Sequence, residues 1–211
     1  MEDKSKKSFD GLLIQVLGRP FSRQLTKLLV KTNITANQVT FISIFLALVA
    51  SYFFSLGDYT SLIIGAIIFK IAYIFDLSDG ELARYKNQAS KFGAWFDDFG
   101  DRIRESTSIF ALSIGLFSII KNPFILILGT VAVINLFLVG YIKSPTLAKV
   151  QTEAEIKLFG YYLGWTETTV YITLLGIVLN QVQYVLWFFV VIGLLAWLKK
   201  FHSIYKSHRT N

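Results

Sequence analysis

The chain has 211 residues, a formal net charge of +7, and 54% hydrophobic and 16% aromatic residues. Its mean hydropathy of +0.53 is too high for a soluble protein of this length and favours an integral membrane protein. Cysteine is absent, which excludes disulfides, thiolate metal sites and a cysteine nucleophile. The two histidines, His202 and His208, lie in a basic C-terminal segment, so an imidazole metal centre is not expected.

Residues 1–34 are predicted to contain a polar N-terminal segment followed by one amphipathic helix. Residues 1–8 are polar and expected to be disordered, and the short apolar run 11–17 shows no signal peptide. From Pro20 onward, apolar side chains recur on one face of a helix. The cations of the same stretch repeat at every fourth position: Arg19, Arg23, Lys27 and Lys31. This pattern is typical of a helix in the membrane interface with its cations toward anionic headgroups, and a surface helix packed on the protein is the alternative.

Six apolar segments follow, and each is predicted to form a membrane-spanning helix: 38–56, 61–78, 93–120, 124–143, 166–181 and 183–199. Thr35, with Gln38 three residues later, resembles a capping box and predicts where the first of these helices begins. The fold class predicted is therefore an all-α integral membrane protein. Its six transmembrane helices are preceded by the amphipathic interfacial helix, and the domains expected are 1–34, 35–201 and a basic cytoplasmic tail, 202–211.

Lysine and arginine are distributed unevenly between the loops. They gather before the first span, between the second and third, between the fourth and fifth, and after the sixth, whereas the alternate loops together carry one lysine. The positive-inside rule then places both chain ends in the cytoplasm of a multi-pass protein of the cell membrane. Because membrane topology explains the positive charge, nucleic-acid binding has no separate support.

Two groups of polar residues flank an eight-residue polar link between the second and third spans. At about 100° per residue, the first group covers about a third of one helix circumference: Asp76, Asp79, Gly80, Ala83 and Arg84. The second group repeats at every fourth position on one face of the next helix: Gly93, Asp97 and Asp101. If the two helices face each other, four carboxylates meet beside two glycines and one arginine.

Four carboxylates at close range repel one another and tend to bind protons. A hard divalent cation removes this conflict, and an all-oxygen ligand set suits Mg²⁺, Ca²⁺ or Mn²⁺ better than zinc. Gly80 and Gly93 let a bulky ligand approach the backbone, and Arg84 supplies a planar fork that matches phosphate. These groups predict metal-assisted phosphoryl transfer. A solvated acidic loop between two membrane helices is the alternative, but it does not explain why the acids keep to one face of each helix.

The pattern D-x2-D-G-x2-A-R-x8-G-x3-D-x3-D runs from Asp76 to Asp101 without a mismatch, with eight fixed positions in 26 residues. It resembles the signature of the CDP-alcohol phosphatidyltransferase family. The resemblance implies a metal-dependent phosphotransferase of phospholipid biosynthesis, with its active site facing the cytoplasm. Such an enzyme transfers a phosphatidyl-type group from a CDP-linked lipid, CDP-diacylglycerol or CDP-archaeol, to a polar alcohol and releases CMP. The resemblance also implies a homodimer.

The same resemblance assigns roles to individual residues. Asp76, Asp79 and Asp97 would ligate two divalent ions, Mg²⁺ or Mn²⁺, on the donor's diphosphate. Asp101 would complete this metal site and act as general base on the acceptor hydroxyl. The residues expected to hold the CDP moiety are Gly80, Ala83, Arg84 and Gly93, with Ser90 in addition. Asn37 and Thr40 resemble the family's P-N-x-x-T motif near the nucleotide, although Ala36 here stands in place of its proline.

The signature does not specify the acceptor alcohol. Lys143, Lys149 and Lys157 are candidates for binding an acceptor phosphate, and positive-inside charge explains these lysines equally well. The sequence segments D-G-E-L-A-R-Y-K and S-K-F-G-A-W are similar to those of the inositol-phosphate branch of the family. Inositol phosphate or glycerol phosphate is therefore the expected acceptor. The alternative is a di-inositol-phosphate-type synthase that uses CDP-inositol as donor.

Three further charged residues lie near the motif. Lys70 lies inside the second span, about 240° around the helix from Asp76, so we expect snorkelling or a helix contact rather than catalysis. Glu105, one turn beyond Asp101 on the same face, is expected to anchor the site or to pair with an arginine. Asp98 lies off this face and is interpreted as structural or solvent-facing.

Two other classes of protein remain open. A membrane prenyltransferase also binds a diphosphate through aspartates and Mg²⁺, but usually from two separate Asp-rich loops. A non-enzymatic transporter also buries acids, but it gives no reason for the pattern of Gly80, Ala83, Arg84 and Gly93. The products separate the three classes, because a prenyltransferase releases pyrophosphate, a transporter releases neither product, and the expected transferase releases CMP.

Overall fold

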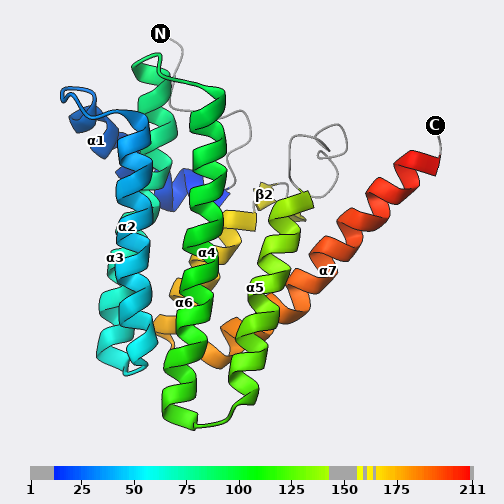
Figure 1. Ribbon diagram of the computed structural model, residues 1–211. Helices are drawn as coiled ribbons and strands as arrows, with labels where there is room; N and C mark the ends of the chain where they lie inside the picture. The colour runs from blue at the N-terminus through cyan, green and yellow to red at the C-terminus, as the bar shows by residue number, and fades with distance from the viewer. Residues whose placement is uncertain (1–11, 143–155, 159–160, 164, 210–211) are drawn as a thin grey trace.

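The computed structural model describes residues 12–142, 156–158, 161–163 and 165–209 (Figure 1). The elements, in chain order, are a π-helical turn η1 (Ile14–Gly18), α1 (Arg19–Leu29), α2 (Ala36–Leu56), α3 (Tyr59–Tyr85), α4 (Lys91–Ile120), α5 (Phe124–Ile142), β1 (Ile156–Leu158), β2 (Tyr161–Leu163), α6 (Trp165–Val178) and α7 (Val182–Arg209). Helices α2 to α7 overlap the six predicted apolar segments in order, and α3 and α7 continue beyond the predicted ends at 78 and 199. Within the described residues, the short antiparallel hairpin β1–β2 is the one departure from an all-helical set of elements.

Side-chain caps fix where the first three long helices begin. Thr35 caps α2 in the predicted capping box: the Gln38 N–H donates to Thr35 Oγ1 (3.3 Å) and the Thr35 N–H to Gln38 Oε1 (2.9 Å). Asp58 caps α3 in the same way by accepting from the Ser61 N–H (2.9 Å). Ser90 caps α4. Each cap satisfies a backbone donor that a helix start leaves unpaired, so these three boundaries are set locally by sequence.

The short turns and the basic segments lie at opposite ends of the bundle (Figure 1). The α2–α3, α4–α5 and α6–α7 turns lie at the lower end, whereas α1, the α3–α4 link and the C-terminus of α7 lie at the upper end. Gly57, in the α2–α3 turn, has a φ of +84°, and a Cβ there would lie 2.3 Å from the Gly115 carbonyl oxygen of α4. Glycine is therefore required by both the backbone conformation and the close approach.

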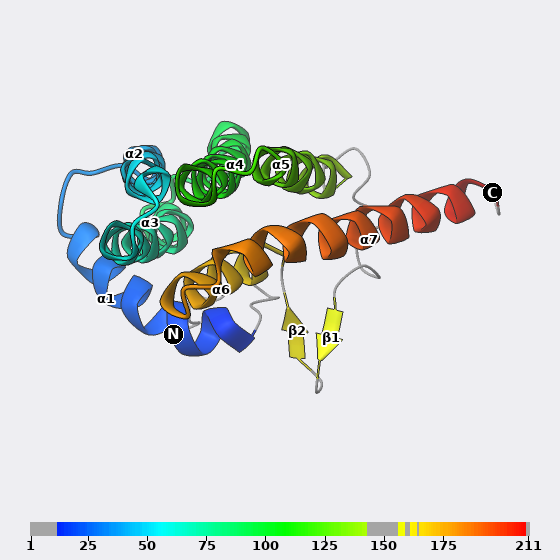
Figure 2. The same cartoon turned by 90° about the horizontal axis from the view of Figure 1, so that it is seen from below.

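Helices α3 and α4 each pack on α2, and α5 packs between α4 and α7, as the view along the bundle shows (Figure 2). The hydrophobic core between the helices includes Phe69, Ile109, Leu136, Ile177, Leu186 and Phe189. One buried amide ties α5 to α7. Asn135 Nδ2 donates to the Phe189 and Val190 carbonyls (3.2 and 2.9 Å), and Asn135 Oδ1 accepts from Trp197 Nε1 (3.2 Å).

Four helical segments are long and apolar enough to cross a membrane: α2, α3, α4 and the Val182–Lys199 part of α7. Large apolar side chains on their outer faces are exposed, among them Phe41, Phe45, Ile67 and Leu195. The apolar stretch Phe124–Gly140 of α5 is shorter, and α6 has 14 residues. The chain is thus a multi-pass membrane protein by the length and composition of these segments, and the count of six spans stays a prediction.

Helix α1 is fastened to α3 by a buried carboxylate. Glu81 is fully buried, and its Oε1 accepts from Arg19 Nη1 (2.6 Å) and Ser22 Oγ (2.7 Å). Its Oε2 accepts from Thr26 Oγ1 (2.8 Å). The three donors are spaced i, i+3 and i+7, so they share one face of α1. A buried carboxylate is tolerated only when it is paired and hydrogen-bonded, and this network meets that condition.

The network corrects one prediction made from the cation pattern. Arg19 was expected to face headgroups, but it is buried against Glu81, because α3 supplies an acid at the point where α1 crosses it. Lys27 and Lys31 are exposed, as expected for the cationic face. The predicted disordered start, 1–8, lies outside the described residues.

Lys70 contacts other elements, as predicted for a lysine inside a span. Its Nζ donates to the Tyr171 hydroxyl of α6 (2.8 Å) and to the Leu17 carbonyl of η1 (3.1 Å), and it lies 4.4 Å from the Tyr171 ring centroid. The ammonium therefore joins three parts of the chain through hydrogen bonds and a cation–π contact.

We expect Glu81→Leu to destabilise the protein by about 3–5 kcal/mol, because it leaves the buried Arg19 charge without its carboxylate. Thermal unfolding in detergent micelles would show a lower Tm. Glu81→Gln, which keeps an acceptor for Ser22 and Thr26, should fall between Glu81→Leu and the parent, and the exposed Lys27→Ala serves as control. Equal Tm values for Glu81→Leu and Lys27→Ala would show that the network does not stabilise the fold.

Candidate metal and phosphate site

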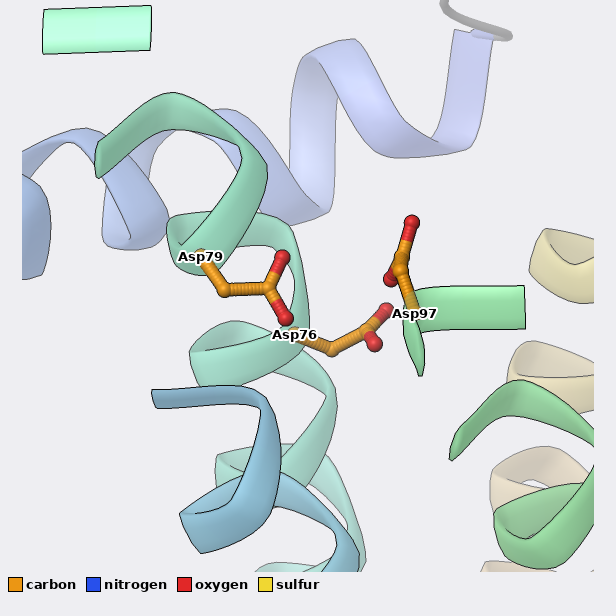
Figure 3. Close-up of side chains that lie close together, drawn as sticks. All are labelled: Asp76, Asp79 and Asp97. Atoms are coloured by element: carbon orange, nitrogen blue, oxygen red, sulfur yellow. The ribbon is translucent and has the colours of Figure 1, made fainter. Parts of the chain in front are cut away.

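Three aspartates meet at the upper end of the bundle, where α3 ends and α4 begins. Asp76 and Asp79 come from α3, and Asp97 comes from α4. One carboxylate oxygen of each lies within 4.8 Å of the others, and the side chains point toward one another (Figure 3). We call these three residues the carboxylate triad. The helical spacing read from the sequence therefore brings three of the four motif acids together.

The triad depends on close packing of α2 against its neighbours. At Gly100 of α4, a Cβ would lie 3.1 Å from Ile44 Cδ1 of α2, so the two helices approach closely one turn below Asp97. From the same helix, Thr40 Oγ1 donates to Asp79 Oδ2 (2.6 Å), and both side chains are buried. Thr40, which the sequence placed near the nucleotide, thus orients a triad carboxylate.

The fourth motif acid, Asp101, is not among the three acids whose oxygens lie within 4.8 Å of one another, but it shares a partner with Asp76. Its Oδ1 accepts from Arg104 Nη2, and the Nη1 of the same arginine donates to Asp76 Oδ1 (2.8 Å). Ser43 Oγ of α2 accepts from Arg104 Nη1 as well (2.9 Å). Sequence reasoning gave Arg104 no role. A signal was present, because Arg104 lies at i+7 from Asp97 and i+3 from Asp101, on the same helix face.

The residues predicted to hold the CDP moiety lie around the triad at the same end of the bundle. A Cβ on Gly80 would meet only Arg84 Nη1, at 3.5 Å, so the backbone at Gly80 is approachable. A Cβ on Gly93 would lie 3.3 Å from Asn37 Oδ1 and 3.1 Å from Ser90 Oγ, which brings these three residues together. Ser90 Oγ also accepts from the Gly93 N–H (3.0 Å) in its capping role. Ala83 and Arg84 are half-buried in the last turn of α3.

The remaining predicted residues are placed as follows. Lys143 and Lys149 lie outside the described residues, and Lys157 lies on strand β1. Glu105 pairs with an arginine, as predicted: its Oε2 lies 2.8 Å from Arg102 Nη1. Asp98 is exposed, also as predicted.

The donor chemistry of the triad fits a hard divalent cation. The three carboxylates offer oxygen ligands only, and Thr40 occupies just one oxygen of Asp79. Arg104 contributes one positive charge beside Asp76, so three closely spaced anions retain a net negative charge. Like charges at this range favour binding of a cation, and the facing helices hold the ligands before it binds.

The family model described as CDP-alcohol phosphatidyltransferase matches residues 33–201. Archaetidylinositol phosphate synthase of Pyrococcus horikoshii is 35% identical over 97 residues, covering 46% of this chain and 50% of the relative. The bifunctional IPC transferase and DIPP synthase of Thermococcus kodakarensis is 28% identical over 132 residues, covering 63% and 29%. The chain thus spans half or less of the length of these curated relatives.

A solved structure shares the fold. Phosphatidylinositol phosphate synthase of Mycobacterium tuberculosis, solved with CDP-DAG bound, superposes with a TM-score of 0.70 at 18% identity, covering 89% of this chain and 94% of that one. A structure of the same protein with manganese and citrate gives a TM-score of 0.69, also at 18% identity. At this identity the likeness shows the fold alone.

We expect Asp79→Asn and Asp97→Asn to abolish tight Mn²⁺ binding, and Thr40→Val to weaken it by roughly 10-fold to 100-fold, the usual effect of losing a hydrogen bond to a metal ligand. The quantity to measure is free Mn²⁺, by electron paramagnetic resonance (EPR) titration of purified protein. Asp98→Asn, next to Asp97 but exposed, is the matched control. Unchanged binding in either triad variant would rule out the triad as the metal site.

Proposed function

The chain belongs to the CDP-alcohol phosphatidyltransferase family, and we propose that it transfers a phosphatidyl-type group from a CDP-linked lipid to a polar alcohol and releases CMP. One observation carries the proposal: the carboxylate triad is formed by the facing ends of α3 and α4, within a complete family signature. The synthase of the same fold that was solved with CDP-DAG bound supports a CDP-lipid donor.

The triad would hold two divalent ions, Mg²⁺ or Mn²⁺, against the donor's diphosphate. Such ions supply charge stabilisation for the transferring phosphoryl group and the leaving CMP. The approachable backbone at Gly80 leaves room for the diphosphate, and Arg84 beside it offers a planar fork to a phosphate oxygen. Asn37, Ser90 and Gly93 cluster at the starts of α2 and α4 and are proposed, with Ala83, to bind the rest of the CDP moiety.

Asp101 is proposed as the general base. An alcohol has a pKa far above neutral, so its proton must pass to a base as its oxygen bonds to phosphorus. The Asp101 carboxylate accepts this proton, the bond to the CMP oxygen breaks, and the products are the phosphodiester lipid and CMP. The side chain of Asp101 is 18% exposed; its Oδ1 accepts from Arg104 Nη2, and its Oδ2 lies 3.9 Å from Arg102 Nη2. Its further role as a fourth metal ligand remains part of the proposal.

The acceptor is proposed to be inositol phosphate or glycerol phosphate. The similarity to archaetidylinositol phosphate synthase supports inositol phosphate, with an ether-linked or ester-linked CDP-lipid as donor. The second candidate uses CDP-inositol as donor, and the similarity to bifunctional IPC transferase and DIPP synthases supports it. Lys143, Lys149 and Lys157 are retained as candidates for binding the acceptor phosphate.

The membrane arrangement is proposed to have six spans, α1 in the interface, and the site on the cytoplasmic side. The α3–α4 link, α1 and the end of α7 lie at the same end of the bundle as the triad, and these segments are basic. Phe21 and Leu28 of α1 are exposed apolar side chains, as expected of an interfacial helix. We also propose three domains, at 1–34, at 35–201 and a tail at 202–211. The protein is further proposed to be a homodimer.

The experiment that tests the proposal measures CMP release by purified protein in detergent with Mg²⁺ or Mn²⁺. CDP-diacylglycerol, its ether analogue and CDP-inositol are each offered with inositol, inositol phosphate, glycerol phosphate and serine. We expect metal-dependent CMP with a CDP-lipid and one phosphorylated acceptor. CMP from CDP-inositol alone would favour the second candidate. Release of pyrophosphate from a prenyl diphosphate, without CMP from any CDP donor, would contradict the proposal.

Asp101→Asn should lower kcat by at least about 100-fold while Mn²⁺ and the CDP-lipid still bind, because the proton acceptor is lost and the triad remains. Donor binding is measured separately from turnover, by equilibrium binding of the CDP-lipid in detergent. Asp98→Asn is again the control. Normal turnover by Asp101→Asn would show that another group accepts the proton.

A further inference from the structure

Arg102 directly follows Asp101 in the sequence, and its guanidinium lies between two helices. The side chain starts on α4, and α5 packs beside that helix (Figure 2). At Gly140 of α5, a Cβ would lie 2.5 Å from Arg102 Nη1, 2.7 Å from its Cζ and 2.8 Å from its Cδ. The glycine therefore makes the room that the guanidinium occupies against the α5 backbone.

One end of this guanidinium is fixed, and the other is not. Arg102 Nη1 donates to Oε2 of the buried Glu105 (2.8 Å). Within the described part of the chain, Nη2 makes no hydrogen bond, and Asp101 Oδ2 lies 3.9 Å from it. The arginine side chain is 17% exposed, so it is not sealed in the core. A buried carboxylate thus holds the planar fork in place and leaves donors for a ligand.

We propose that Arg102 binds the phosphate of the acceptor alcohol through Nη2 and so selects a phosphorylated acceptor over the free alcohol. This inference deepens the proposed function of the site and rests on it. An acceptor hydroxyl at Asp101 brings the rest of a small acceptor within reach of Nη2, because the two side chains are 3.9 Å apart. A guanidinium nitrogen is a permanently charged donor that suits a phosphate oxygen. A free alcohol cannot use this donor and binds less tightly.

A purely structural ion pair explains only half of this arrangement. The bond between Arg102 Nη1 and Glu105 accounts for one terminal nitrogen, but it gives no reason for the second nitrogen to lie beside Asp101 without bonding to it. A ligand that carries both a hydroxyl and an anionic oxygen satisfies the carboxylate with the first group and Nη2 with the second.

The charges around Arg102 are compatible with an anionic ligand. Its two acidic neighbours are Asp101 and Glu105. Arg104 also pairs with Asp101, so two arginines balance two carboxylates at this corner of the site. Divalent ions at the triad would make the surroundings positive, which favours a phosphate.

The test measures the KM of each substrate separately, with the full chain in detergent. We expect Arg102→Gln to raise the KM for inositol phosphate or glycerol phosphate by roughly 10-fold to 100-fold, the usual effect of losing a hydrogen bond to a charged group. The KM for the CDP-lipid should change little. Arg102→Lys, which keeps the charge, should recover part of the loss. Arg84→Gln is the reciprocal control, because it should raise the KM for the CDP-lipid and not that for the acceptor.

A second variant moves the guanidinium without removing it. Gly140→Ala places a methyl group where Arg102 Nη1 now lies, so it should also raise the KM for the phosphorylated acceptor. This variant keeps the proposal testable if Arg102→Gln does not fold.

Calorimetric titration provides a readout that does not depend on turnover. With Mn²⁺ and no donor, the parent should bind inositol phosphate or glycerol phosphate more tightly than inositol or glycerol, and Arg102→Gln should abolish this preference. If the parent binds a phosphorylated acceptor but turns over no CDP donor, the proposed function fails and binding alone decides the inference. No preference in the parent, parent-like binding by Arg102→Gln, or an equal loss of CDP-lipid binding would each overturn it.

Discussion

Buried negative charge is the constraint that the rest of this structure has to meet. Helices α3 and α4 carry several buried or partly buried acids into the packed end of a membrane-spanning bundle, where water stabilises them less than at an open surface. Asp76 pairs with Arg104, Asp79 accepts from Thr40, Glu81 pairs with Arg19, and Glu105 pairs with Arg102. Each of these contacts stabilises a carboxylate whose burial would otherwise destabilise the fold.

Most of these partners also connect helices, so the side chains that neutralise the buried acids also hold the helices together. Arg19 fastens α1 to α3, and Thr40 fastens α2 to α3. Arg104 adds α4 by contacting Ser43 and Asp76. The ligands of the proposed metal site therefore rest on a scaffold of buried hydrogen bonds, which holds them close together before an ion binds.

Much of this arrangement could be predicted from the sequence, because it follows from helical periodicity. The spacing of the four motif acids predicted one site on two facing helices, and three of the four, Asp76, Asp79 and Asp97, lie together there. Thr35 with Gln38 predicted the start of α2. Capping and one-face spacing are local properties of the chain, and they do not depend on how distant segments pack.

Pairing between distant segments could not be predicted in this way. Arg19 matched the spacing of an exposed cationic face, and only its contact with Glu81, 62 residues away, reveals that it is buried. Helical spacing likewise does not show that Arg104 contacts Ser43 of α2 and Asp76 of α3 as well as Asp101 of its own helix. Helix α6 ends at Val178, before the predicted end of its segment at 181, because Asn180 adopts a left-handed conformation (φ +55°) and the Gln181 N–H donates back to the Gly176 carbonyl (2.7 Å).

The central claim is that the carboxylate triad holds metal ions against the diphosphate of a CDP-linked lipid. The most direct measurement is ³¹P hyperfine coupling to Mn²⁺ bound to the protein, recorded by electron–nuclear double resonance with and without CDP-diacylglycerol. The account predicts a ³¹P coupling that appears with the donor, is absent with diacylglycerol alone, and is lost in Asp97→Asn. Bound Mn²⁺ with a bound donor and no ³¹P coupling would contradict it.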